Sequence, residues 1–339
     1  MSDAPETIRR DKRGRVRRRD FLGIAAGAAT WPRRAHAQQQ KVRTIGFLAE
    51  GAPVSLQVGE FRQGLAEMGY VEGRNVAIEF RAAHNDLSRL RELARDLVRR
   101  EVDVIVAPGS GAAVRAARAE TDTIPIVFAD SGDPVTSGLV ASLSHPGGNL
   151  TGISDFGDGM SAKRLEFMKL LVPRISTVAL VFRANNPSMA RLAAAAQGPA
   201  RSLGIETFDL PVGNADELEA AFATLAAKRA DGFCLLPNVL FVNLGRQVLD
   251  LALRHRVPGV YPVVSFVEYG GLMSYGSGTG ERNYQTGIYA GRILNGTKPA
   301  DLPVYRLTRF QLAINLTTAK ALRLDVPATF LALADQVIE

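Results

Sequence analysis

One stretch of the chain reads Val102-Asp103-Val104-Ile105-Val106-Ala107, and Pro108-Gly109-Ser110-Gly111 and the helix-forming residues 112–119 follow it directly. A run of β-branched residues with little polar alternation is typical of a strand buried on both faces. The glycine-rich turn leads straight into a helix, as in a strand–turn–helix unit. The stretch therefore predicts an α/β fold, with a parallel sheet covered by helices on both faces.

The same alternation of short apolar runs and longer helical patterns continues outward in both directions. In the first half, strands are expected at 44–49, 75–80, 102–107 and 125–129, and helices at 57–68, 87–100 and 112–119. In the second half, strands are expected at 177–182, 206–210, 232–236 and 259–261, and helices at 161–171, 188–203, 215–228 and 240–254. These halves predict two doubly wound, Rossmann-like lobes.

The C-terminal part of the chain does not belong to one half alone. It contains two more expected strands, at 270–276 and 310–315, and two more helices, at 284–294 and 317–322. We expect each lobe to be completed by a piece of this tail, which requires three crossings between the lobes. The expected boundaries are 38–153 plus 264–305 for lobe 1 and 154–263 plus 306–339 for lobe 2.

The N-terminal segment 1–37 carries most of the chain's basic excess. It holds ten Lys and Arg residues against four acidic ones, and so six of the seven net positive charges. Arg18-Arg19-Asp20-Phe21-Leu22 is followed by a short apolar run and by Ala35-His36-Ala37. This layout predicts a twin-arginine-like export signal that is cleaved after Ala37, and a periplasmic mature chain. The remaining chain is nearly neutral, so we expect no nucleic-acid partner.

The sequence offers little for catalysis. Glycine-flanked nucleophile and phosphate-binding motifs are absent, and no dinucleotide fingerprint follows the first strand. The three histidines beyond the leader, His84, His145 and His255, lack metal-ligand spacing, and the single cysteine, Cys234, lies in an apolar run. We therefore expect no enzyme activity, no metal and no cofactor.

Ligand-binding features are easier to find, because ligands of open α/β sheets lie at the carboxyl ends of the strands. The loops expected there combine glycines, short polar side chains and carboxylates. The candidate binding residues are Glu50, Ser110, Gly111, Asp130 and Asp133 in lobe 1, and Asn185, Asn238 and Tyr261 in lobe 2. We expect a ligand between these two groups, in a cleft that closes by a hinge motion.

Two of these candidates have alternative roles that the residues leave open. Ser110 and Gly111 open a helix, where free backbone N–H groups could capture a ligand carboxylate or simply form a capped turn. Asp133 precedes a proline, and its carboxylate could cap the next helix or meet a ligand ammonium group. Glu50 is the other candidate for that ammonium group.

Three motifs carry a resemblance to a known family. They are Gly132-Asp133-Pro134-Val135 with Pro146-Gly147-Gly148-Asn149, then Gly270-Gly271-Leu272-Met273-Ser274-Tyr275-Gly276, and finally Ile314-Asn315-Leu316-Thr317-Thr318-Ala319-Lys320 with the end of the chain. Together they resemble the ABC transporter substrate-binding family whose better-known members bind tryptophan or tyrosine. The resemblance covers nearly all of the chain after residue 41.

The resemblance implies a type I periplasmic-binding fold, a small-molecule solute in the cleft, and an ABC permease and its ATPase as partners. We expect a monomer that meets the membrane only through the transporter. Relatives often carry an acid in the loop at Pro237-Asn238, so Asn238 weakens an ammonium site there. The expected solute is polar and amino-acid-like, or an aromatic carboxylate. A ligand-sensing protein of a signalling or regulatory system is the alternative function.

Overall fold

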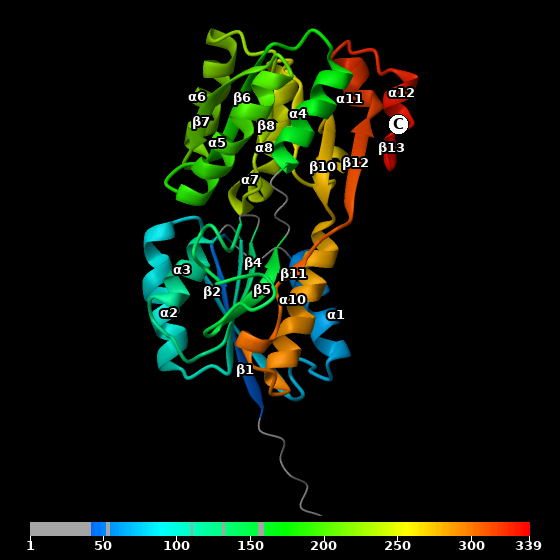
Figure 1. The fold of residues 1–339 in the computed structure, drawn as a ribbon. Helices are drawn as coiled ribbons and strands as arrows, with labels where there is room; N and C mark the ends of the chain where they lie inside the picture. The colour runs from blue at the N-terminus through cyan, green and yellow to red at the C-terminus, as the bar shows by residue number, and fades with distance from the viewer. Residues whose placement is uncertain (1–41, 52–54, 110, 131–132, 155–158) are drawn as a thin grey trace, which may run out of the picture. The chain divides into compact units, whose positions relative to one another are not determined.

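The fold consists of two α/β sheets with helices on their faces (Figure 1). The structure, a computed structural model, describes residues 42–51, 55–109, 111–130, 133–154 and 159–339. We call each sheet with its covering helices a lobe. Within the described residues, no helix is both long enough and apolar enough to cross a membrane.

The first sheet has the strand order β11-β5-β4-β3-β1-β2, and all its pairs are parallel. Its strands are β1 Arg43–Ala49, β2 Val76–Ala82, β3 Val104–Gly109, β4 Ile126–Asp130, β5 Leu150–Ser154 and β11 Tyr305–Arg306. Its helices are α1 Ser55–Glu67, α2 Leu90–Arg99, α3 Ala112–Arg118 and α10 Thr279–Leu294, with the short 3-10 helices η1 Leu87–Arg89 and η2 Pro299–Asp301. The apolar runs thus form central strands, as a sheet covered on both faces requires.

Two separate apolar clusters lie on the faces of this sheet. On one face, Phe61 and Leu65 of α1 and Ile293 of α10 pack on β1, β3 and β4. On the other face, Leu97 of α2 and Val114 of α3 pack on the same strands. Because α10 comes from the C-terminal third of the chain, the first lobe is completed late in the sequence.

The second sheet has the strand order β13-β12-β10-β9-β8-β6-β7. Its strands are β6 Thr177–Arg183, β7 Glu206–Val212, β8 Gly232–Leu235, β9 Gly259–Tyr261, β10 Met273–Ser277, β12 Phe310–Asn315 and β13 Gln336–Ile338. Its helices are α4 Met160–Leu171, α5 Pro187–Ser202, α6 Asp216–Ala227, α7 Val239–Asn243, α8 Gly245–Arg254, α9 Ser265–Glu268, α11 Leu316–Ala321 and α12 Ala328–Leu331. Only the β10–β12 pair of this described sheet is antiparallel.

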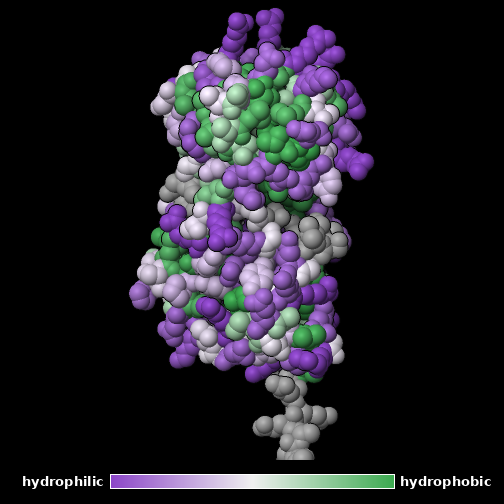
Figure 2. All heavy atoms as spheres, turned by 90° about the vertical axis from the view of Figure 1, so that its right-hand side faces the viewer, coloured by the Kyte–Doolittle hydropathy of each residue, from purple (hydrophilic) through white to green (hydrophobic). Residues whose placement is uncertain are grey.

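The C-terminal elements form one edge of the second sheet. Figure 2 shows hydrophobic residues gathered on the upper part of the face that it views. Large apolar side chains that stay exposed after α12 and in β13 include Leu333 and Val337. A hollow of about 420 Å³ lies beside them, between α11 and α12, with Lys320 and Arg323 among its lining residues. All the residues that line this hollow belong to the second lobe.

The chain passes between the lobes three times, after β5, after β10 and after β11. Three crossings were predicted, but the expected start of the lobe 1 tail at residue 264 is wrong. The helix α9 and the strand β10 belong to the second lobe, because β10 pairs with β9 on one side and with β12 on the other. The segment that returns to the first lobe begins only after Ser277.

Several short elements were not predicted from the sequence. The strands β5, β11 and β13 and the helices α9 and α12 have between two and five residues each, too few to show a period. The helix expected at 240–254 is divided at Leu244 into α7 and α8. A glycine at the first position of α8 is consistent with this break.

Cys234 lies in β8 and is fully buried in the second lobe. Burial raises the pKa of its thiol to about 11, since the thiolate would lose its hydration. We expect the folded chain to resist thiol reagents at pH 8, and to react once denatured. A time course with an aromatic disulfide reagent, with and without denaturant, checks this. Rapid labelling of the native chain would contradict the burial.

Candidate functional site

In the first lobe, the carboxyl ends of β1 and β3 bring a buried carboxylate against a glycine turn. Glu50 follows β1 directly and is only 2% exposed. Gly109 ends β3 with a φ of +133°, and a Cβ added there would lie 3.2 Å from Oε1 of Glu50. Gly111 is the N-cap of α3 and has a φ of +84°, a conformation that favours glycine. The positive φ values therefore explain why glycine occupies both positions.

In the second lobe, the carboxyl ends of β6 and β8 carry buried polar side chains. Asn186 caps α5 and accepts a hydrogen bond from the backbone N–H of Ser188 at 3.1 Å. Asn238 caps α7 in the same way, accepting from the N–H of Leu240 at 2.9 Å. Each amide thus holds the start of a helix at the edge of the sheet where a ligand of this fold class binds.

Hydrogen bonds join these two edges. Nη2 of Arg183, at the end of β6, donates to the carbonyl oxygen of Asn85 at 2.6 Å. Nη1 of Arg115 in α3 donates to the hydroxyl of Ser188 at 3.2 Å. The strand ends of the two sheets therefore face each other, and polar groups from both lobes line the contact.

Arg183 is the most deeply buried cation at this contact, with 6% of its surface exposed. Loss of hydration lowers the pKa of its guanidinium, whereas the negative charges of Glu50 and Glu217 oppose that shift. Nη1 of the same side chain donates to the carbonyl oxygen of Gly213. The guanidinium stays charged because arginine keeps its proton even when it is partly desolvated.

The eight predicted binding residues take several different positions in the structure. Ser110 lies outside the described residues, and for Asp130 only the backbone is described, at the end of β4. Glu50, Gly111 and Asn238 lie at the strand-end edges. Asp133 lies in its own turn, where its carboxylate accepts from the N–H of Val135 at 2.9 Å and from the hydroxyl of Thr136. The residues that follow form a turn rather than the helix that the capping alternative expected, so the carboxylate holds a turn here.

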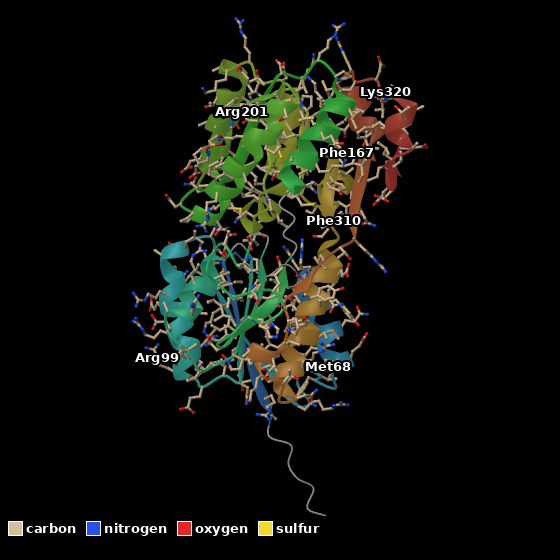
Figure 3. All side chains as sticks on the ribbon, viewed as in Figure 1. Met68, Arg99, Phe167, Arg201, Phe310 and Lys320 are labelled. Carbon is tan, nitrogen blue, oxygen red and sulfur yellow. The ribbon has the colours of Figure 1, made fainter. Side chains whose placement is uncertain are left out.

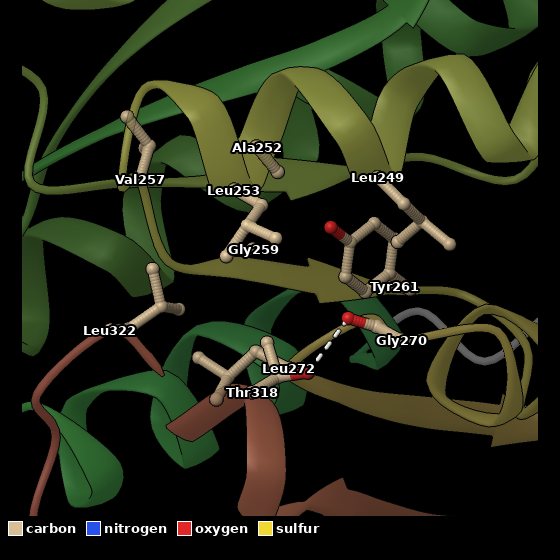
Figure 4. Close-up of a pocket in the computed structure, with 10 residues that line it drawn as sticks. All are labelled: Leu249, Ala252, Leu253, Val257, Gly259, Tyr261, Gly270, Leu272, Thr318 and Leu322. Carbon is tan, nitrogen blue, oxygen red and sulfur yellow. Dashed lines mark hydrogen bonds between the residues drawn. The ribbon is translucent and has the colours of Figure 1, made fainter. Parts of the chain in front are cut away.

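Asn185 and Tyr261 take different places at the strand ends of the second lobe. Asn185 is exposed and has a φ of +56°, while its neighbour Asn186 carries the buried cap. Tyr261 is 1% exposed, and its ring stacks on Phe266 with 4.9 Å between centroids. The ring lines a small cavity of about 10 Å³ between β9, α8 and α11, large enough for about one water molecule (Figure 4). Tyr261 is therefore a core residue, because its side chain points between the sheet and its helices.

Four residues at the contact were not among the predicted binding residues, namely Asn85, Arg115, Arg183 and Ser188. Arg183 does follow a predicted strand directly, which is a usable signal. The others lie in a loop or within the first turns of helices, where the sequence does not show that they face the other lobe. Among the described residues there is no group of three or more His, Cys, Asp and Glu side chains that could hold a metal.

The family model for the ABC transporter substrate binding protein matches residues 42–338. The chain belongs to this family. It is a family of substrate-binding proteins rather than of enzymes. The match covers both lobes and all three crossings, and it confirms the family that the three sequence motifs indicated.

Individual relatives are similar over nearly the whole chain. A tyrosine-binding protein of Clostridioides difficile (strain R20291) is 28% identical over 298 residues, which are 88% of this chain and 85% of the relative. A Streptococcus pneumoniae ABC domain, solved in complex with L-Trp, is 26% identical with a TM-score of 0.80, and the alignment covers 87% of this chain and 99% of that one. A conserved domain protein of Vibrio cholerae gives the same TM-score and identity, over 88% of this chain and all of that one.

More distant structures share the fold alone. A 5-methylthioribose-binding protein of Thermotoga lettingae is 15% identical with a TM-score of 0.59, and covers 88% of this chain and 98% of its own. The predicted fold class is thereby confirmed, since the chain has the two mostly parallel α/β lobes of type I periplasmic-binding proteins.

Proposed function

We propose that this protein captures a small polar solute between its two lobes and presents it to an ABC permease and its ATPase. The observation that carries this proposal is the hydrogen-bonded contact between the strand-end edges of the two sheets. Ligands of open α/β sheets lie at that edge, and two lobes joined by crossings can close around one. Membership of a substrate-binding family supports the same function.

We place the solute among the start of α3 at Gly111, the end of β4 at Asp130, and the helix starts capped by Asn186 and Asn238. Two of these helices, α3 and α5, begin at the contact between the lobes. The positive end of the α5 dipole favours a negative group, so the solute would be an amino-acid-like or aromatic carboxylate. The relatives described above, one named for tyrosine and one holding L-Trp, support this class of ligand.

We also propose the cellular compartment in which the protein binds its solute. The leader at 1–37 would direct export by the twin-arginine route, with cleavage after Ala37. The mature chain would then bind its solute in the periplasm as a monomer, without catalysing any reaction and without a cofactor.

Identification of the solute is the first test. Mass spectrometry of small molecules released by denaturing the purified mature chain is expected to find a carboxylate, and L-tryptophan and L-tyrosine are the first probes for titration. Gly111→Leu should weaken the bound probe by about tenfold or more, because a side chain at this turn occupies the site and separates the ligand from the helix start. Isothermal titration calorimetry measures the change in Kd.

The matched control is Gly138→Leu. Gly138 also has a positive φ, of +70°, and nothing lies within 4 Å of a Cβ added there, so it carries a comparable backbone strain away from the site. Equal Kd values for the Gly111 and Gly138 variants would contradict the proposed site. A loss of affinity in Lys320→Glu instead would move the solute to the hollow between α11 and α12, where Figure 3 labels Lys320.

A further inference from the structure

One cluster at the contact between the lobes is built entirely from the chain's own polar groups. The guanidinium of Arg183 in the second lobe donates to the carbonyl oxygens of Asn85 in the first lobe and of Gly213 in the second. The N–H of Asn85 in turn donates to the carbonyl oxygen of Glu50 at 2.7 Å. We call these four residues the arginine bridge.

The backbone of the bridge is held in place on both sides. In the first lobe, Asn85 has a φ of +68°, and its N–H donates to the carbonyl oxygen of Glu50. In the second lobe, the N–H of Gly213 donates to a carboxylate oxygen of Glu217 at 2.6 Å. The carbonyl oxygens that receive Arg183 are therefore positioned before any ligand is considered.

Charge gives Glu50 a role in the same cluster. Glu50 is buried, and its negative charge acts on the guanidinium of Arg183, which is also buried. A buried cation is stable only when nearby groups replace its lost hydration. Two carbonyl oxygens accept hydrogen bonds from the guanidinium, and the charge of Glu50 adds a longer-range attraction. The carbonyl oxygen of Asn85 and the charge of Glu50 belong to the first lobe, so they act fully on Arg183 only when the lobes are in contact.

The close approach of the lobes continues next to the bridge. A Cβ added to Gly51 would overlap with Nδ2 of Asn243 at the end of α7 and would lie 3.2 Å from Oδ1 of Asn85. Gly51 and Asn85 belong to the first lobe, and Asn243 belongs to the second. A side chain at residue 51 would therefore require the Asn243 amide of the other lobe to move.

We propose that Arg183 and Glu50 are positioning residues that hold the two lobes together without touching the solute. The inference rests on the proposed function and deepens it, since it assigns Glu50 to Arg183 rather than to a ligand ammonium group. In this proposal the bridge stabilises the contact between the lobes whether or not a solute is bound, and the affinity would depend on residues outside the ligand's reach.

The test measures the distance between the lobes in the absence of solute. Spin labels are attached at Arg99→Cys in α2 and Arg201→Cys in α5, one exposed position in each lobe (Figure 3). The buried Cys234 stays in place, because its thiol is fully buried and is expected to resist labelling in the folded chain. Double electron–electron resonance on the dialysed mature chain then gives the populations of joined and separated lobes.

We expect Arg183→Met to lower the ratio of joined to separated lobes by about tenfold or more, because hydrogen bonds to a charged group are lost. Arg191→Met is the matched control, since Arg191 is an exposed arginine of α5, and it should leave the ratio unchanged. Arg183→Lys keeps the charge and should restore part of the joined population. Equal distance distributions for the Arg183→Met and Arg191→Met chains would overturn the proposal.

Gly51→Val provides a second, independent variant, which keeps every charge. It should lower the ratio of joined to separated lobes, as Arg183→Met does. Gly59→Val in α1 should leave this ratio unchanged, because nothing lies within 4 Å of a Cβ added at Gly59. Circular dichroism melting of all variants separates a changed lobe contact from a failure to fold. An unchanged population in folded Gly51→Val would count against a tight contact at this point.

The distance measurement also distinguishes this inference from the proposed function. If neither L-tryptophan nor L-tyrosine binds but Arg183→Met still separates the lobes, the bridge is real and only the ligand class is wrong. If a probe binds and Glu50→Gln lowers its affinity without changing the lobe distance, Glu50 contacts the ligand and the assignment to Arg183 is wrong.

Discussion

Gly287→Ala is expected to lower the free energy of unfolding by about 3 kcal/mol or more, at or beyond the upper end of what overpacking usually costs. Gly287 lies in α10, where that helix crosses α1. A Cβ added there would overlap with the carbonyl oxygen of Phe61 and would lie 2.7 Å from the backbone nitrogen of Leu65. Both atoms belong to the backbone of α1, so no change of rotamer can make room.

The crossing leaves little space elsewhere. A Cβ at Gly64 of α1 would overlap with the carbonyl oxygen of Tyr284, and one at Gly291 of α10 would overlap with Cβ of Met68. Separation of the two helices would expose Phe61, Leu65 and Ile293, which belong to one buried cluster of the first lobe. The helices therefore cannot move apart without loss of that cluster.

Urea denaturation of the mature original chain and of the Gly287→Ala variant, followed by circular dichroism, measures the difference in their free energies of unfolding. The control is Gly59→Ala, also in α1 but with nothing within 4 Å of the added Cβ. That variant should gain about 0.5–1 kcal/mol, because alanine loses less backbone entropy in a helix than glycine does. If both variants had the same denaturation midpoint, the close crossing of α1 and α10 would be wrong.

Replacement of both Arg18 and Arg19 by lysine is expected to abolish export. The twin-arginine pathway recognises the arginine pair itself, so a change that keeps both positive charges should still block it. Immunoblotting of periplasmic and cytoplasmic fractions measures the result. The precursor should accumulate in the cytoplasm, and the mature chain beginning at Gln38 should be missing from the periplasm.

A variant in which Arg33 and Arg34 are replaced by lysine serves as the control, since this second arginine pair lies after the apolar run. It should be exported and cleaved like the original chain. Normal export of the Arg18 and Arg19 variant would show that a different secretion route is used.

Much of the fold could be predicted from the sequence because its central strands are continuous apolar runs. The strands β1, β3, β6 and β8 begin and end within about three residues of their predicted bounds. Edge strands were missed for a physical reason. β11 has two residues and β13 has three, and their pairing partners β5 and β12 determine their conformation more than their own side chains do.

The candidate site was harder to predict, because its geometry depends on contacts between residues far apart in the chain. Glu50, Gly111 and Asn238 could be placed from the rule that strand ends form the binding edge. Tyr261 follows the same rule by sequence position, but its side chain turns into the core, where the absence of a Cβ at Gly259 leaves space for it. Arg183 is 98 residues from Asn85, and no local pattern shows that they meet.

The crossing of α1 and α10 also has a consequence for synthesis of the protein. A ribosome releases α1 more than two hundred residues before α10, and the whole strand-and-helix series from β6 to β10 emerges in between. Until then, the face of the first sheet that α10 will cover remains open to solvent and to chaperones. An N-terminal fragment cannot complete this lobe by itself, so the nascent chain reaches its stable state only near the end of translation. An export route that carries folded proteins would therefore act after synthesis of the chain, not during it.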